Sequence, residues 1–180
     1  GDCINPDFVG QTVGIRTSPF TAPLLPEIKI DAVGYPETVL GGPEAAVQAA
    51  VNLTSNDRAQ MVEAPQTFFS IEDPQATILG RYTESGKAAA GCKQTKDCTN
   101  WFFGLPITSA GLLRSLFAAC GVHIYNPEND ALLAGGGLIL LHTEQGGGKT
   151  LTLKNGKRVS LQLAPAQTVI LDAETGESLI

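Results

Sequence analysis

The stretch from residue 105 to residue 125 constrains the fold most, because it holds the most strongly periodic apolar segment of the chain. Pro106 lies just before this segment, Thr108 or Ser109 can cap a helix there, and Gly121 suits a left-handed residue at its end. We therefore predict a helix over residues 108–120. Its buried side is predicted to carry five residues at helical spacing: Leu112, Leu113, Leu116, Phe117 and Cys120.

The residues around this helix favour short strands. Residues 122–125 alternate like a strand, and a helix that runs almost directly into a strand is typical of a layered unit. Further strands are predicted where β-branched or aromatic runs lie between turn residues, at 12–15, 27–30, 67–71, 76–82, 87–91 and 99–103. Short links favour antiparallel neighbours. A second, short helix is predicted at 44–51. The predicted class is α+β, with a mixed, mainly antiparallel sheet covered by the helix at about 108–120.

The last part of the chain is nearly all strand and turn. Strands are predicted at 138–143, 150–153, 159–163, 168–171 and 178–180. Asn155 and Gly156 favour a hairpin in which both residues have positive φ. We expect a small, sandwich-like antiparallel β domain over residues 131–180, after a first domain over residues 1–130 and a turn-rich boundary at 126–136.

Charge and hydropathy limit the partners. The formal net charge is −6, with 12 basic residues scattered along the chain. Binding through nucleic-acid phosphates needs clustered Lys and Arg, so no nucleic-acid partner is expected. No apolar run reaches the length of a membrane span, so no membrane partner is expected either.

The cysteines Cys3, Cys92, Cys98 and Cys120 form no metal-binding pattern, and the chain has only two histidines. We predict no metal and no cofactor. Cys92 and Cys98 flank a polar hairpin tip, where they either close a short disulfide loop or remain free thiols. A bridge would favour a location outside the cytoplasm; otherwise the sequence leaves the location open.

Two motifs invite a catalytic interpretation that their context opposes. Residues 144–150, EQGGGKT, lack the first glycine of a phosphate-binding loop and precede a strand, so a hairpin loop is predicted. Glu72 and Asp73, and the acidic run 128–130, are tempting as a carboxylate pair, but both stand in turn sequences. His123 has no nucleophile beside it. No catalytic residue is predicted.

Trp101, Phe102 and Phe103 form the aromatic cluster of the chain. In a strand, Trp101 and Phe103 share one side and Phe102 lies on the other. At least one side is expected to pack in the core. If Trp101 is exposed, Trp101 and Phe103 would instead be a glycan or interface contact.

Residues 68–90, 101–153 and 169–177 resemble the C-terminal part of family 42 β-galactosidases and related glycoside hydrolases. The likeness runs from about residue 67 to 177 and includes DP-A-LGRY, P-LL-R-L-AACGVHIY and D-ETGE. In that family a catalytic (β/α)₈ barrel precedes an amidotransferase-like trimerisation domain and a small β domain. The resemblance implies that residues 1–130 are part of the amidotransferase-like domain and 131–180 the β domain.

The same resemblance implies that the barrel and its two glutamates are absent from this chain, and that Cys3 stands in no amidotransferase elbow. The leading expectation is a non-catalytic accessory module that contacts an upstream glycoside-hydrolase barrel or self-associates, with carbohydrate as a further partner. The alternative is a free-standing secreted or periplasmic glycan-binding protein. A third hypothesis is an independent enzyme with an unrecognised site, which would turn over substrate by itself.

Overall fold

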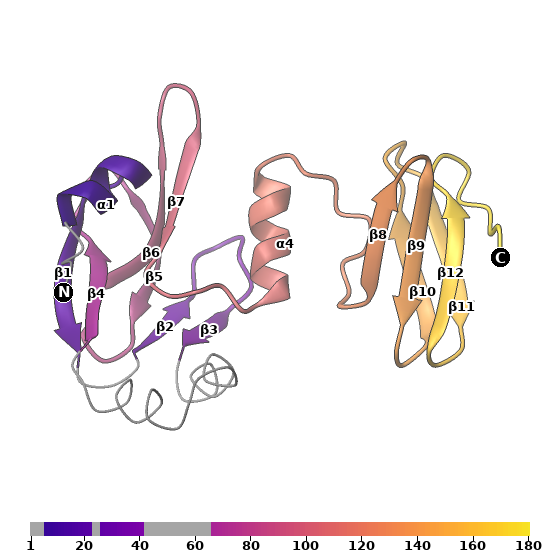
Figure 1. Cartoon of the computed structure of the whole chain (residues 1–180), viewed down its shortest axis with the longest axis horizontal. Helices are drawn as coiled ribbons and strands as arrows, with labels where there is room; N and C mark the ends of the chain where they lie inside the picture. Colours follow the sequence, from indigo (N-terminus) through magenta and orange to yellow (C-terminus); the bar gives the residue numbers. More distant parts are fainter. Residues whose placement is uncertain (1–5, 23–25, 42–65) are drawn as a thin grey trace. The chain divides into compact units, whose positions relative to one another are not determined.

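A computed structural model describes residues 6–22, 26–41 and 66–180 (Figure 1). The helix predicted at 44–51 lies outside these ranges, as does Cys3. The described residues form twelve strands and two helices, and every strand pair is antiparallel. The protein is therefore richer in β-structure than the α+β prediction implies. No helix in the described ranges has the length and apolar character to cross a membrane.

The chain divides into two compact units, Gly1–Leu112 and Leu113–Ile180. The division falls earlier in the chain than the boundary expected at 126–136. Hydrogen bonds explain why the connector belongs with the second unit: Arg114 donates to the Glu128 carbonyl, and the Thr152 N–H donates to the Tyr125 carbonyl.

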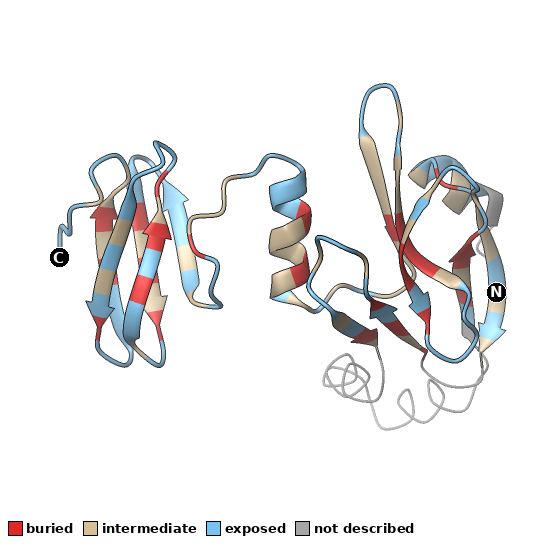
Figure 2. Cartoon of the chain, turned by 180° about the vertical axis from the view of Figure 1, so that it is seen from behind, coloured by how far each residue is buried: buried red, intermediate tan, exposed pale blue. Residues whose placement is uncertain are grey.

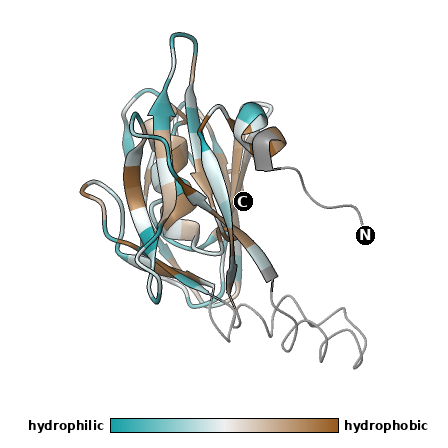
Figure 3. Cartoon of the chain, turned by 90° about the vertical axis from the view of Figure 1, so that its left-hand side faces the viewer, coloured by the Kyte–Doolittle hydropathy of each residue, from teal (hydrophilic) through white to brown (hydrophobic). Residues whose placement is uncertain are grey.

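The first unit contains a strand pair and a five-stranded sheet. Strand β1 (Thr17–Ala22) pairs with β4 (Gln66–Ile71). The sheet has the order β3-β2-β5-β6-β7. Its strands are β2 (Glu27–Ile30), β3 (Thr38–Gly41), β5 (Thr77–Tyr82), β6 (Ala88–Gln94) and β7 (Thr99–Phe103). The strands predicted at 27–30, 67–71, 76–82, 87–91 and 99–103 are thus confirmed. The tip of the β6–β7 hairpin is hydrophilic (Figure 3).

The strand predicted at 12–15 is wrong, because these residues include the end of helix α1 (Pro6–Val13). Pro6 suits the first helical position, where a missing N–H costs nothing. Gly14 then ends the helix at a φ of +71°. Ile15 is fully buried beside Ile71 and Phe102, and Val9 and Val13 of α1 pack against this cluster.

Helix α4 (Ala110–Ala119) matches the predicted principal helix. The Leu112 N–H donates to Ser109 Oγ at 3.2 Å, which confirms the predicted cap. At the other end, the Val122 N–H donates to the Phe117 carbonyl and the Gly121 N–H to the Ala118 carbonyl, with Gly121 at a φ of +78°. This pair of bonds is a Schellman motif.

Fewer residues of α4 are buried than the apolar spacing predicts. Leu112 and Leu116 are buried, whereas Phe117 is 50% exposed. Cys120 is exposed and not a buried hydrophobe, because the helix ends one residue before it. The strand predicted at 122–125 is also wrong: the Schellman turn redirects the chain, and the following residues form no ladder.

The second unit is a small sandwich, as predicted. Strands β8 (Ala131–Gly135), β9 (Leu138–Thr143) and β12 (Gln167–Asp172) form one sheet in the order β12-β9-β8. Strands β10 (Gly147–Thr152) and β11 (Arg158–Leu163) form the other. Buried and exposed residues alternate along these strands (Figure 2). The core they enclose consists of Ile139, Leu141, Leu151, Leu153, Leu163, Val169 and Leu171.

Two predicted turns differ in detail from the structure. Residues 144–146 do not close a hairpin, because β9 and β10 lie in different sheets. The β10–β11 hairpin at Asn155 and Gly156 is confirmed, but only Gly156 has a positive φ, at +84°. The Gly156 N–H donates to the Leu153 carbonyl, and the Leu153 N–H to the Lys157 carbonyl. This pattern fits a type I turn with a glycine bulge. Of residues 178–180, Ser178 makes a single bridge to Leu171.

Candidate functional site

The acidic run 128–130 and the glycine loop lie together at a cleft of about 580 Å³, where β9 ends and β10 begins. The cleft combines carboxylates, amides, a histidine and a lysine. Its lining residues are Glu128, Asn129, Asp130, Ala131, His142, Glu144, Gln145 and Lys149. The sequence analysis treated these two segments separately, and the sandwich topology brings them to one place.

Lys149 is the central residue of this cleft. It occupies an inward position on β10, alternating with the core residue Leu151, and is only 9% exposed. Its Nζ lies 2.6 Å from Glu128 Oε2 and 2.9 Å from Asp130 Oδ2. Hydrogen bonds to Glu128 and Asp130 raise the pKa of Lys149, so one ammonium neutralises both carboxylates.

Asp130 is held from several sides. Burial by itself would raise the pKa of this carboxyl, but hydrogen bonds from Lys149, Thr143 and Asn126 outweigh burial and leave the pKa below its usual value. The Asn126 Nδ2 donates to Asp130 Oδ2 at 3.1 Å. A general acid needs a raised pKa, so Asp130 is suited to an ion pair and not to donating a proton.

The second acidic pair, Glu72 and Asp73, is also fixed in a turn. Asp73 Oδ2 accepts hydrogen bonds from Lys93 Nζ at 2.7 Å and from the Arg16 N–H at 3.2 Å. The Gln75 N–H donates to Asp73 Oδ1 at 3.0 Å. The bond from Lys93, followed by that from Gln75, lowers the pKa of Asp73 to about 2. Asp73 therefore stays ionised and stabilises the link between β4 and β5.

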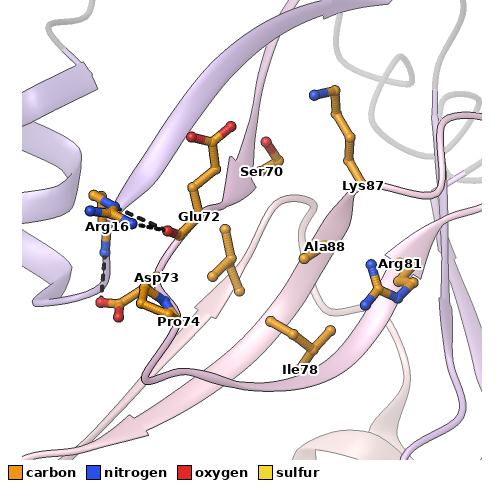
Figure 4. Close-up of a pocket in the computed structure, with 10 residues that line it drawn as sticks. Arg16, Ser70, Glu72, Asp73, Pro74, Ile78, Arg81, Lys87 and Ala88 are labelled. Carbon is orange, nitrogen blue, oxygen red and sulfur yellow. Dashed lines mark hydrogen bonds between the residues drawn. The ribbon is translucent and has the colours of Figure 1, made fainter.

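A pocket of about 410 Å³ adjoins this turn (Figure 4). It is lined by Arg16, Ser70, Ile71, Glu72, Asp73, Pro74, Ile78, Arg81, Lys87 and Ala88. Arg16 donates from Nε and Nη2 to the Glu72 carbonyl at 3.0 and 2.6 Å. Sequence reasoning missed this pocket, because its basic residues are far apart along the chain and strand pairing brings them together.

Trp101 and Phe103 are both half-buried on β7, and Phe102 is buried on the opposite side with Ile15 and Ile71. The Trp101 ring makes an edge contact with Tyr35, with centroids 6.0 Å apart. The Trp101 Nε1 is buried and has no hydrogen-bond partner among the residues that the structure describes. Trp101 is therefore partly packed against its own unit and does not form an open aromatic platform.

Cys92 and Cys98 are free thiols in the structure, so the bridge considered from the sequence is not formed. The register explains why. Cys92 pairs with Trp101 across the ladder, whereas Cys98 lies opposite Thr95 at the hairpin tip. Three residues of strand separate the two positions by about 10 Å, and a disulfide needs Cα atoms within about 7 Å. Cys98 Sγ instead donates to Asn100 Oδ1.

His123 and His142 each contact a hydrogen-bonding partner inside the second unit. His123 Nε2 lies 2.7 Å from the Thr152 carbonyl oxygen, and His142 Nδ1 lies 2.9 Å from Thr168 Oγ1. Over the part of the chain that the structure describes, no three His, Cys, Asp or Glu side chains gather in a way that could hold a metal ion.

Comparison with known proteins gives one similar structure. No family model matches the chain, and neither does any curated protein. Among solved structures, the chain is similar to a β-galactosidase from Rahnella sp. R3, with a TM-score of 0.46 and 13% sequence identity. The match covers 91% of this chain and 25% of that one, so this chain spans a quarter of the length of that enzyme.

Proposed function

We propose that this chain is a non-catalytic accessory module of a carbohydrate-active enzyme, which supports contacts with a catalytic barrel or between subunits. The observation that carries the proposal is that the candidate carboxylates form ion pairs with lysines. Lys149 binds both Glu128 and Asp130, and Lys93 binds Asp73. Each acidic run that invited a catalytic interpretation is thus held by a lysine inside its own unit.

Glycoside hydrolysis makes demands that these pairs do not meet. One carboxyl must be protonated near neutral pH while a second, ionised carboxylate faces it across the substrate. Asp73 and Asp130 both have a lowered pKa, which keeps them ionised. Lys149 Nζ also occupies the space between Glu128 and Asp130 that an attacking water or a sugar would need.

The sequence resemblance is a second, separate argument for the accessory role. The similar segments belong to the C-terminal region of family 42 β-galactosidases, outside the catalytic barrel. We accordingly propose that the first unit, Gly1–Leu112, corresponds to part of the amidotransferase-like trimerisation domain expected over residues 1–130, and that the sandwich over residues 131–180 corresponds to the small β domain. The catalytic barrel, in this proposal, lies in the same parent enzyme.

A second candidate function is a free-standing secreted or periplasmic glycan-binding protein. The observation that favours it is the pocket in Figure 4, where aliphatic side chains lie between polar and charged ones. Such a protein would bind sugar without the help of a catalytic barrel.

An assay of the purified chain tests the non-catalytic part of the proposal. We expect no release of 4-nitrophenol from a panel of aryl glycosides above the rate of a matched Glu128→Gln/Asp130→Asn variant, with the fold of both checked by circular dichroism. Turnover by the native chain that is lost in the variant would contradict the proposal and would assign catalysis to these carboxylates.

A further inference from the structure

The pocket in Figure 4 gathers positive charge on an acidic chain. The chain has 18 acidic and 12 basic residues, yet Arg16, Arg81 and Lys87 all line this one pocket. Its acidic lining residues are Glu72 and Asp73, and Asp73 is already paired with Lys93. The pocket therefore has an excess of positive charge that a bound anion would balance.

Two of these cations keep donors available. Arg81 donates from Nη1 to the Gly86 carbonyl at 3.0 Å, which fixes the guanidinium, and its other nitrogens make no hydrogen bond to any described residue. Lys87 Nζ lies 5.7 Å from the centroid of the Phe20 ring. Neither Arg81 nor Lys87 forms an ion pair with a carboxylate among the described residues.

Aliphatic side chains complete the pocket. In Figure 4, Ile78 and Ala88 lie between Arg16 on one side and Arg81 on the other. Ile78 and Arg81 lie on β5 and Ala88 begins β6, while Arg16 directly precedes β1. The β5–β6 hairpin therefore fixes most of this lining. An aliphatic floor beside guanidinium and ammonium groups suits a small ring with an anionic substituent, because Arg binds carboxylate and sulfate in a forked geometry.

We propose that this pocket binds a saccharide unit that carries a carboxylate or a sulfate group. The C–H face of the sugar ring packs on Ile78 and Ala88, and the anionic group accepts hydrogen bonds from Arg81 and Lys87. The choice of a saccharide rests on the proposed function, whereas the choice of an anion rests on the charge of the pocket itself.

Isothermal titration of the full chain tests this proposal with four probes: trigalacturonate, its methyl ester, a κ-carrageenan tetrasaccharide and sodium sulfate. We expect at least one of the two anionic saccharides to bind at least tenfold more tightly than the methyl ester, and its affinity to fall with added salt. The Arg81→Gln/Lys87→Gln variant should lose at least tenfold in affinity. The matched control Lys154→Gln, which removes an exposed charge from the other unit, should bind like the native chain.

Other outcomes overturn the proposal. Binding of the methyl ester as tightly as both anionic saccharides, or no binding of either anionic saccharide, rules out the anionic-saccharide site. Sulfate that binds as tightly as the saccharides makes the pocket a simple anion site. Unchanged affinity in the Arg81→Gln/Lys87→Gln variant places any binding elsewhere. None of these results changes the turnover assay, so failure of the pocket and failure of the accessory role remain distinguishable.

Discussion

At the scale of single residues, a lysine forms ion pairs with two of the carboxylates that the sequence singled out. Lys149 is inserted among core residues of the sandwich, and its charge is tolerated because Glu128 and Asp130 bind it. A buried carboxylate that loses its partner becomes strongly unfavourable. The ion pair is therefore expected to contribute to the stability of the second unit.

Replacing Lys149 with methionine should lower the midpoint of thermal unfolding by several degrees, because Asp130 would keep its burial and lose its ammonium partner. The matched control is Lys154→Met, since Lys154 is exposed and its replacement should leave the midpoint nearly unchanged. Equal midpoints for the two variants in scanning calorimetry would show that the buried ion pair has no stabilising role.

Asp73 predicts a specific dependence of stability on pH. The folded protein binds a proton at this carboxyl only near pH 2, whereas the unfolded chain binds it near the ordinary value of 3.8. The stabilisation is therefore complete above pH 3.8 and is lost as the pH falls toward 2. In urea titrations over this range, the free energy of unfolding of Asp73→Asn should fall less steeply than that of the native chain. The exposed Asp97, changed to Asn, serves as the control, and identical slopes for native chain and Asp73→Asn would refute the assignment.

At the scale of elements, a hydrogen bond from a side chain to the backbone joins the strand pair to the five-stranded sheet. The Tyr82 hydroxyl on β5 donates to the Phe69 carbonyl on β4 at 2.9 Å, and burial raises the pKa of Tyr82 to about 12. Gly104, just after β7, leaves room for this bond, since a Cβ there would collide with the Tyr82 hydroxyl.

Gly104→Ala should therefore destabilise the fold by about 1 to 3 kcal/mol, as expected for overpacking. Gly135→Ala is the matched control, because a Cβ at Gly135 meets nothing within 4 Å. In the background of Tyr82→Phe, which removes the colliding oxygen, the Gly104→Ala change should cost less. The measurement is chemical denaturation of the four variants. A Gly104→Ala cost that equals that of Gly135→Ala would contradict this contact.

The β6–β7 hairpin predicts the state of its cysteines. Mass spectrometry of unreduced peptides from protein purified without reductant should find Cys92 and Cys98 unlinked, because the ladder holds them too far apart. Cys98 is exposed and should react with iodoacetamide sooner than Cys92, which is half-buried and has a pKa raised by burial. A Cys92–Cys98 peptide in that sample would mean that the hairpin register differs from the one described.

Local signals explain which elements the sequence predicts correctly. Strands β2, β4, β5, β6 and β7 and helix α4 follow from β-branched runs, turn residues and caps that act within a few positions. Strands β1 and β3 were not predicted. The N-terminal helix was missed because the glycines in the region of α1 oppose a helical interpretation, and its stability comes from Val9 and Val13 packing on Ile15. Residues 122–125 alternate like a strand, but the Schellman turn at Gly121 gives them no neighbour to pair with.

At the scale of the whole molecule, the sites depend on long-range pairing that sequence patterns do not contain. The cleft around Lys149 forms where the chain passes from β9 in one sheet to β10 in the other, whereas the sequence predicted a hairpin loop there. The pocket near Arg81 brings Arg16 next to residues between Ser70 and Ala88. Pairing of β1 with β4 and of β5 with β6 brings these segments together. Composition predicted a net negative charge, but no local motif predicted a pocket lined by three basic residues.

The size of the native gene product tests the central claim, an accessory role within a larger carbohydrate-active enzyme, most directly. An antibody raised against this chain would be used in an immunoblot of the source cell. We predict a band several times larger than 18.8 kDa, the mass of this chain, because the catalytic barrel would belong to the same polypeptide. A band near 18.8 kDa with no larger species would contradict the accessory role and favour a glycan-binding protein that acts alone.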